Sequence, residues 1–293
     1  MATVAVLDVG GTSIKTGVVD VDQQSRGAGA VTIGASVPTR ATEEADVVLG
    51  QLATAIDSAL GLAPSAPVGL AIAFPGPFDV VGGRAMILGL HKFESIYGLE
   101  LRPLLTARIA RPDLPIRFVR DSEAAGVGEA VFGAGRDGGR VLTITLGTGL
   151  GSCLTDDGVV IETVGELEIE KLAQRSTPHG RADDVLSARG LADRLGVATA
   201  DLRSAIGGDP TGGPVAPVVS DHGRRLGDFL APVVDEMTVD LVVIGGGLVA
   251  AFDQFGPALR DALGPIPCVP GELGVAGPLL GAARLAFPPG SGP

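Results

Sequence analysis

The 293-residue chain is poor in aromatic residues, cysteine and positive charge, and each shortage excludes a class of protein. It has no tryptophan, one tyrosine and nine phenylalanines, so its core must be built from aliphatic side chains. Two cysteines give no disulfide framework. Because 34 acidic residues outnumber 22 basic ones, the net charge is −12, which argues against a nucleic-acid-binding surface.

Long hydrophobic runs are also missing. We find no uninterrupted stretch of about 18 apolar residues and no basic segment followed by an apolar one at the start of the chain. We therefore expect a cytoplasmic protein with neither a membrane nor a nucleic acid as partner. Hydrophobic residues make up 45% of the chain, and its length suits two α/β domains with sizeable cores.

Glycine is abundant, and two glycine-cornered segments carry most of the information. Residues 4–20 and 142–154 each contain a β-branched run, a Gly/Thr corner and a second apolar run. Because glycine accepts positive φ without strain, the pattern predicts strand, tight turn, strand. Exposed backbone N–H groups and a threonine hydroxyl at such a corner form a nest for phosphate oxygens. The corner residues are Gly10, Gly11 and Thr12 in the first segment and Gly147, Thr148 and Gly149 in the second.

A third glycine cluster, Gly245-Gly246-Gly247, ends an apolar strand and precedes a helix that runs through 255–263. Together with Ala250 it matches the dinucleotide-binding fingerprint, which favours a Rossmann oxidoreductase. A Rossmann domain usually begins with that strand and continues with several βα units, whereas only about 40 residues follow here. A structural turn between strand and helix is the other alternative.

The three clusters occur in the order used by the actin-like ATPase superfamily, and within it the chain resembles the ROK family of sugar kinases and related proteins. Four further stretches resemble that family: 73–79, 119–125, 128–135 and 277–283. The resemblance covers nearly the whole chain. It implies a two-domain α/β fold of the actin-like ATPase type, a duplicated ribonuclease H-like fold with an interdomain cleft.

The expected organisation follows from this resemblance and from the hydrophobic periods. An N-terminal α/β domain is predicted over 1–118, with a closing helix at 279–287, and a C-terminal α/β domain over 119–278. The tail at 288–293 is rich in proline and glycine and is expected to be disordered. Within the chain we predict helices at 43–60 and 122–133 and strands at 68–73 and 116–119.

Phosphoryl transfer needs a phosphate cradle, a metal ion and a base on the acceptor hydroxyl. All three glycine clusters are expected to hold the phosphates of ATP. Asp8 lies where the family places a carboxylate that faces the metal-bound phosphates, so we expect it to reach Mg²⁺ through water. The residues alone leave a second possibility, in which Asp8 ends a strand and bonds the turn amides.

Asp121 is the candidate general base. Taken alone, an aspartate between a strand and a helix is more often a helix N-cap. The family resemblance favours catalysis instead. Since a helix N-terminus also favours the charged form of a carboxyl group, we expect Asp121 to be ionised at neutral pH.

Several positions depart from the family pattern. Arg120 stands where ROK kinases usually carry Asn, and Thr163 and Glu166 replace a Glu and a His. The Cys-rich zinc loop is missing, so we expect no structural zinc. The segment 91–99 replaces the usual Asn-Leu-x-Gly-Trp strip. Expected substrate contacts are Gly76, Arg120, Asp121, Glu166 and Asp183, and Arg120 either pairs with Glu166 or binds an anionic group of the substrate.

These features favour an ATP-dependent kinase that phosphorylates a hexose or a related polyhydroxylated substrate; a homodimer is implied by the resemblance alone. A polyphosphate-dependent glucokinase is an alternative, because the stretch 165–168 is similar to the corresponding loop of those enzymes. A catalytically silent sensor that binds sugar or nucleotide is another, since pocket residues are substituted. Retention of Asp8, Asp121 and both corners argues against the sensor.

Overall fold

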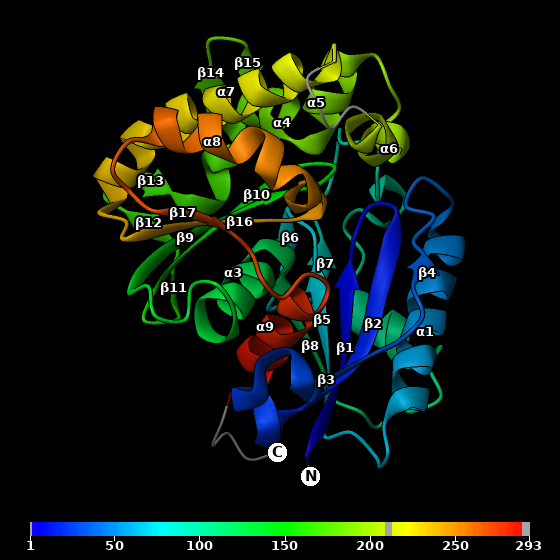
Figure 1. Ribbon diagram of the computed structural model, residues 1–293. Coiled ribbons are helices and arrows are strands. Elements are labelled where there is room, and N and C mark those ends of the chain that lie inside the picture. Colours follow the sequence, from blue (N-terminus) through cyan, green and yellow to red (C-terminus); the bar gives the residue numbers. More distant parts are fainter. Residues whose placement is uncertain (1, 209–212, 289–293) are drawn as a thin grey trace. The chain divides into compact units, whose positions relative to one another are not determined.

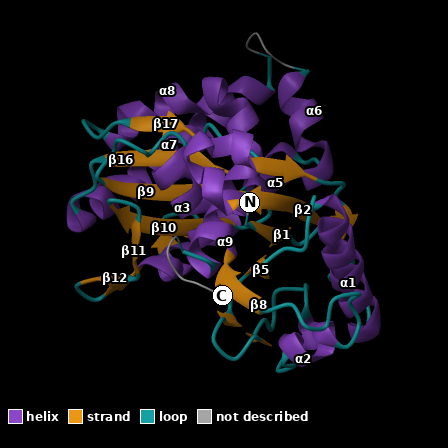
Figure 2. Cartoon of the chain, turned by 90° about the horizontal axis from the view of Figure 1, so that it is seen from below, coloured by secondary structure: helices purple, strands orange, loops and turns teal. Residues whose placement is uncertain are grey.

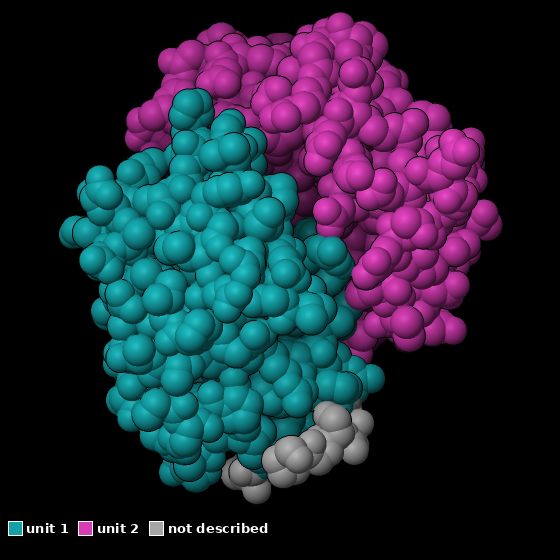
Figure 3. All heavy atoms as spheres, turned by 180° about the vertical axis from the view of Figure 1, so that it is seen from behind, with its two compact units in different colours: residues 1–128, 275–293 teal, residues 129–274 magenta. Residues whose placement is uncertain are grey.

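The computed structural model describes residues 2–208 and 213–288 (Figure 1). The chain folds into two compact units, residues 1–128 with 275–293 and residues 129–274 (Figure 3). The boundary expected after residue 118 would cut β8 (Ile116–Arg120), which belongs to the sheet of the first unit. The observed boundary lies within α3 (Asp121–Phe132) instead. Of the tail expected to be disordered, residues 289–293 lie outside the described residues.

The first unit is built on a sheet of order β3-β2-β1-β5-β8, with β4 also paired to β2. The strands β3, β2 and β1 are antiparallel, whereas β1, β5 and β8 are parallel. All six residues of β5 are buried, as predicted for a strand covered on both faces. The strands are β1 (Thr3–Val9), β2 (Ser13–Asp20), β3 (Val31–Ile33), β4 (Val37–Pro38) and β5 (Gly69–Phe74), followed by β8.

Helix α1 (Ala45–Leu62) covers this sheet and confirms the predicted helix. Its buried residues recur at helical spacing and pack in the core of the first unit. By length and composition α1 could also cross a membrane, but core helices of soluble proteins pass the same test. The unit further contains α2 (Leu101–Thr106) and α9 (Ala276–Ala286), the predicted closing helix, which packs on β1 and β5.

The second unit repeats the plan of the first. Its sheet has the order β11-β10-β9-β16-β17, with an antiparallel part from β11 to β9 and a parallel part from β9 to β17. The strands are β9 (Arg140–Leu146), β10 (Leu150–Asp156), β11 (Val159–Ile161), β16 (Leu241–Gly245) and β17 (Cys268–Pro270). The matching order confirms the predicted duplicated α/β fold. It also makes the Rossmann interpretation wrong, because that fold is mostly parallel and begins with its fingerprint strand.

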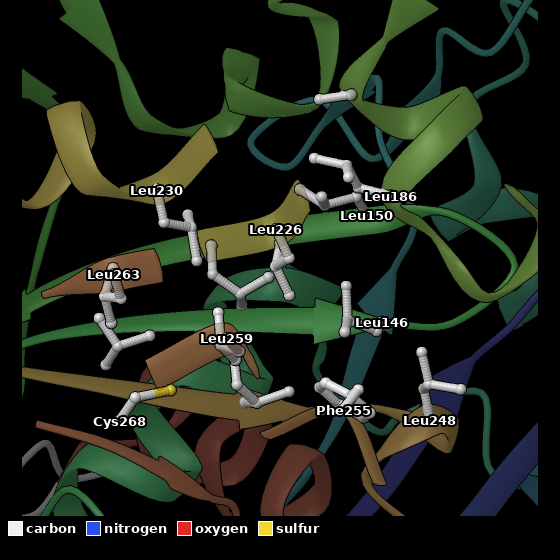
Figure 4. Close-up of a cluster of buried hydrophobic side chains, with 14 of the residues drawn as sticks. Leu146, Leu150, Leu186, Leu226, Leu230, Leu248, Phe255, Leu259, Leu263 and Cys268 are labelled. Atoms are coloured by element: carbon white, nitrogen blue, oxygen red, sulfur yellow. The ribbon is translucent and has the colours of Figure 1, made fainter. Parts of the chain in front are cut away.

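Two long helices cover one face of this second sheet. They are α7 (Val215–Met237), which the sequence analysis missed, and α8 (Phe252–Leu263). Gly223 and Gly227 of α7 allow close packing, because an added Cβ would lie 2.1 Å from the Phe255 oxygen and 2.6 Å from the Leu259 oxygen. Figure 4 shows the core beneath them, where Leu226 and Leu230 of α7 meet side chains from α8 and the sheet.

The remaining elements are short (Figure 2). Three two-stranded ribbons pair β6 with β7, β12 with β13 and β14 with β15. Their strands are β6 (Phe78–Asp79), β7 (Arg84–Ala85), β12 (Thr163–Val164), β13 (Leu167–Glu168), β14 (Ser176–Thr177) and β15 (Gly180–Arg181). The helices α4 (Ala182–Leu186), α5 (Ala188–Leu195) and α6 (Leu202–Gly207) lie in the second unit. The 3₁₀ segments are η1 (Val21–Ala30), η2 (Glu94–Ile96), η3 (Ile169–Gln174), η4 (Thr199–Asp201) and η5 (Gly247–Ala251).

Glycines in two of the family-like stretches bring α3 and α9 together. A Cβ on Gly281 would lie 1.8 Å from the Ala124 oxygen, and a Cβ on Gly128 would lie 2.1 Å from the Gly277 oxygen. Neither contact tolerates a side chain. Close packing of these helices fixes the position of α3, and with it Asp121 at the first turn.

Candidate active site

The first glycine corner joins the end of β1 to the start of β2 in the first sheet. Gly10 N donates to Ser13 O at 3.1 Å, which closes the turn. Thr39 holds the corner from outside, because its Oγ1 donates to Gly10 O at 2.7 Å and its N to Thr12 O at 3.1 Å. Thr12 is exposed at the tip. The corner therefore presents polar groups on a backbone that is braced in place.

Positive φ is not what these corners require, so that part of the sequence interpretation is wrong. Neither Gly10 and Gly11 nor Gly147 and Gly149 adopt a φ between +20° and +160°. Space is the constraint at two of them: an added Cβ would lie 3.0 Å from Ser13 O at Gly10 and 2.8 Å from Asp183 Oδ1 at Gly149. At Gly147 the nearest atom would be 3.9 Å away.

Asp8 and Asp121 lie at the same end of the first sheet, where the parallel strands β1 and β8 finish. Asp8 pairs with Ala73 of β5, and the next residue of β5, Phe74, pairs with Arg120 at the end of β8. The pKa of Asp8 is raised to about 7, chiefly by burial and also by the nearby Asp121, while Lys15 lowers it. The two carboxylates are half-buried and lie near enough for the charge of Asp121 to affect the ionisation of Asp8.

Asp121 is the first residue of α3, and its Oδ1 accepts a hydrogen bond from the N–H of Ser122 at 2.7 Å. Burial raises the pKa of Asp121 to about 6, while the Ser122 amide and Lys92 lower it. The helix terminus therefore does not dominate, contrary to the expectation from sequence. Because the pKa remains below 7, the predicted ionised form still prevails at neutral pH.

Lys92 is a neighbour of this carboxylate pair that sequence reasoning did not assign. Its side chain reaches the first corner, where a Cβ built on Gly11 would lie 3.6 Å from Lys92 Cδ. Its charge acts on Asp121. In the sequence, the segment 91–99 differs from the Asn-Leu-x-Gly-Trp strip of the family, but this difference does not indicate where the Lys92 side chain points.

The second corner, Gly147 to Gly149, joins β9 to β10 in the second unit. Asp183 braces it: Asp183 Oδ1 accepts from Leu150 N at 2.8 Å, and Oδ2 lies 3.0 Å from Arg189 Nη2. Ala188 N also donates to Gly147 O at 2.9 Å. Asp183 was expected to contact substrate, but its carboxylate supports the corner backbone in this structure.

The third cluster lies beside the second corner, because β16 runs parallel to β9 and Gly245 pairs with Thr145. Gly246 has φ 85°, and a Cβ there would lie 2.6 Å from Leu146 N. Gly246 therefore meets both the conformational and the spatial requirement for glycine. Gly247 begins η5 and has no atom within 4 Å of an added Cβ.

The other expected substrate contacts are scattered. Gly76 is exposed on the loop after β5, with no atom within 4 Å of an added Cβ. Arg120 pairs with Glu123 of α3 at 2.7 Å, a partner that the sequence analysis did not consider. Glu166 is exposed in the turn between β12, which contains Thr163, and β13.

Within 2–208 and 213–288, no three His, Cys, Asp or Glu side chains gather so that they could hold a metal ion. Cys153 and Cys268 are both buried. The absence of a structural zinc stays a prediction.

Comparisons with known proteins agree with this architecture. The model of the ROK family matches residues 4–166. A polyphosphate glucokinase from Mycobacterium leprae (strain TN) is 24% identical over 96% of this chain and 73% of its own. Among solved structures, an inorganic polyphosphate/ATP-glucomannokinase from Arthrobacter sp. strain KM is 26% identical with a TM-score of 0.74 and covers 98% of both chains. A ROK family glucokinase from Streptomyces griseus, in complex with glucose and AMPPNP, is 21% identical with a TM-score of 0.79 over 97% of this chain and 99% of its own.

Proposed function

The chain belongs to the ROK family, and from this premise we propose that it is an ATP-dependent sugar kinase in which Asp121 is the general base. It is a phosphotransferase that acts on a sugar hydroxyl, as its glucokinase relatives indicate. The observation that carries the proposal is the pair Asp8 and Asp121 at one sheet edge, next to a braced phosphate corner.

Asp121 suits the role of base on chemical grounds. A general base works best when its pKa lies near the working pH, and burial brings the pKa of Asp121 to about 6. The carboxylate would accept the hydroxyl proton as the sugar oxygen attacks phosphorus. Its bond from Ser122 N orients the carboxylate at the first turn of α3.

Asp8 fits a magnesium ion. A half-buried carboxylate whose pKa is raised to about 7 beside a second carboxylate is poorly compensated by the protein, and a divalent cation would compensate it. We propose that Asp8 holds Mg²⁺ through water, and when bound this ion would neutralise phosphate charge. Gly10, Gly11 and Thr12 in the first unit, with the two glycine clusters of the second, are the proposed phosphate contacts.

The proposed sugar contacts are Gly76, Arg120 and Glu166 besides Asp121. Asp183 is better explained as the brace of the second corner, because the Leu150 amide and Arg189 occupy its oxygens. A cytoplasmic location and a homodimer remain part of the proposal from family resemblance.

The phosphoryl donor has a second candidate. Two of the similar proteins are named for polyphosphate, and one of these also for ATP. This favours testing inorganic polyphosphate beside ATP, since a glycine corner binds phosphate oxygens from either molecule.

A transfer assay tests the proposal. Purified protein with Mg²⁺ is given ATP or polyphosphate and a panel of hexoses, amino sugars and sugar acids, and phosphorylated products are identified by mass spectrometry. We expect a sugar monophosphate from at least one pair of substrates. No product from any pair, without thermal stabilisation by any sugar, would contradict the kinase and favour the silent sensor.

A further inference from the structure

The segment that carries Lys92 is held in an unusual backbone conformation. His91 and Phe93, on either side of Lys92, have φ of 54° and 59°, in the left-handed region that non-glycine residues rarely adopt. Such a conformation persists only where the surroundings impose it, and two in succession around one residue indicate that its position matters.

The surroundings of this segment do impose it. The Phe93 ring is fully buried and packs on Phe74 with ring centroids 5.2 Å apart. Phe93 N donates to Ala41 O at 2.6 Å, and His91 N donates to Glu94 Oε1 at 3.0 Å. Lys92 is therefore anchored from both sides, and its backbone is fixed relative to β5.

The anchored side chain lies between two parts of the proposed site. Its aliphatic stem passes Gly11 of the first corner, and its ammonium acts electrostatically on Asp121. Lys92 is half-buried. Other cations of this edge have partners: Lys15 Nζ donates to Ser13 Oγ at 2.8 Å, and Arg120 pairs with Glu123. In the part of the chain that the structure describes, the Lys92 ammonium makes neither a hydrogen bond nor an ion pair.

We propose that Lys92 Nζ contacts the transferred phosphoryl group, an inference that rests on the proposed kinase function. A cation whose stem passes the phosphate corner and whose charge acts on the base is suited to meet the phosphoryl group. During transfer the sugar oxygen forms a bond to phosphorus, the bond from phosphorus to the donor oxygen breaks, and the hydroxyl proton moves to Asp121. Lys92 stabilises the charge on the phosphoryl oxygens, which is how most catalysis of this reaction arises.

An alternative occupant is an anionic group on the acceptor sugar. The position beside Gly11 argues against it, because a cation that served the acceptor alone would have no reason to lie along the phosphate corner. The two roles differ in kinetics. Loss of a contact made only in the transition state lowers kcat, whereas loss of an acceptor contact raises KM for that acceptor.

The test compares Lys92→Met, Lys92→Arg and Lys171→Met with the wild type, using the donor and sugar identified in the transfer assay. Met keeps the aliphatic stem of Lys92 and removes the charge. Lys171 is an exposed lysine of the second unit that pairs with Glu168 and serves as the matched control. Melting temperatures of all variants are measured first, and we expect them to stay within about 2 °C of the wild type.

We expect Lys92→Met to lower kcat by about 10²–10³-fold with little change in sugar KM. Lys92→Arg should recover part of this loss, and Lys171→Met should behave as wild type. The charged groups that act on Asp121 are Asp8, Lys92 and Glu123, so Lys92→Met also moves the acid limb of the kcat/KM profile to higher pH. The kcat/KM of Lys92→Met at high pH should nevertheless stay below that of the wild type.

Three results would overturn the inference. They are an unchanged kcat in Lys92→Met, recovery of full activity at high pH, or a loss confined to the KM of anionic sugars. Recovery at high pH would mean that Lys92 only tunes Asp121. Failure of the wild type to phosphorylate any sugar is a different outcome, which contradicts the kinase itself.

Discussion

Among single residues, burial shifts the pKa values of Asp8, Asp121 and His222, with opposite effects on the acids and the base. Burial raises the pKa of Asp8 to about 7 and of Asp121 to about 6, because the charged carboxylates are poorly solvated. The pKa of His222 in α7 is lowered to about 4, chiefly by burial and also by the guanidinium of Arg194. The carboxylates lie in the proposed site, whereas His222 is a structural residue.

The buried histidine predicts how stability changes with pH. The native state resists protonation of His222, so the unfolded state binds more protons between its pKa of 6.5 and the native value of about 4. The stabilisation is complete above pH 6.5 and is lost as the pH falls toward 4. We expect His222→Gln, which does not titrate, to remove up to about 3 kcal/mol of this acid dependence of the unfolding free energy.

Urea unfolding at pH 7.5, 6 and 4.5 provides the measurement. His179→Gln is the control variant, because it makes the same substitution at an exposed histidine. An identical decline of stability in the wild type and in His222→Gln would contradict the assignment.

At the scale of elements, the three glycine clusters have similar sequences but different structural needs. Gly147 has open space and an ordinary φ, so its glycine is explained by access for a ligand and not by the turn. Gly246 packs on the backbone of Leu146 with a left-handed φ, so its glycine is required by the fold. The third cluster thereby fixes the end of β9 and the second corner that follows it.

Substitution of two adjacent glycines distinguishes a glycine that the fold requires from one that it does not. Gly246→Ala places a Cβ 2.6 Å from Leu146 N and O in a strained conformation, and we expect it to lower the free energy of unfolding by at least about 2 kcal/mol. Gly247→Ala adds a methyl group in open space and should change it by under about 0.5 kcal/mol. Chemical denaturation of both variants measures the two free energies of unfolding. Equal values would contradict the different roles assigned to Gly246 and Gly247.

Periodicity was sufficient to predict most elements near the site. The spacing of Val48, Leu52 and Ile56 predicted α1, and the continuous apolar run predicted β5. Helix α7 was missed, although its buried face has helical spacing from Val219 to Met237. Contacts between distant residues had no such signal: neither the approach of Lys92 to Gly11 nor the bond from Leu150 N to Asp183 leaves a periodic pattern.

At the scale of the whole molecule, duplication is the organising feature. Both units place a hairpin with a glycine corner at the start of a sheet that continues in parallel strands. The sequence showed this through two similar hairpins, which is why the fold class could be predicted. The exact end of the first unit could not, because α3 continues without interruption through residue 128.

Stability of the whole chain should not depend on zinc. The two cysteines, Cys153 and Cys268, are buried, and residues 2–208 and 213–288 contain no cluster of ligands for a metal ion. We expect a zinc-selective chelator to change the melting temperature by less than about 1 °C. A fall of many degrees would reveal a structural zinc and contradict the prediction.

The central claim, phosphoryl transfer with Asp121 as base, is tested most directly by the turnover of Asp121→Asn on the sugar identified in the transfer assay. Asn keeps the volume and can still accept the Ser122 N–H, so we expect a change in the free energy of unfolding of under about 1 kcal/mol. Asp113→Asn, at an exposed aspartate of the same unit, is the control and should retain wild-type activity. The account predicts that kcat of Asp121→Asn falls by about 10²–10⁴-fold or more, as expected for loss of a general base. Wild-type kcat in a folded Asp121→Asn variant would contradict it.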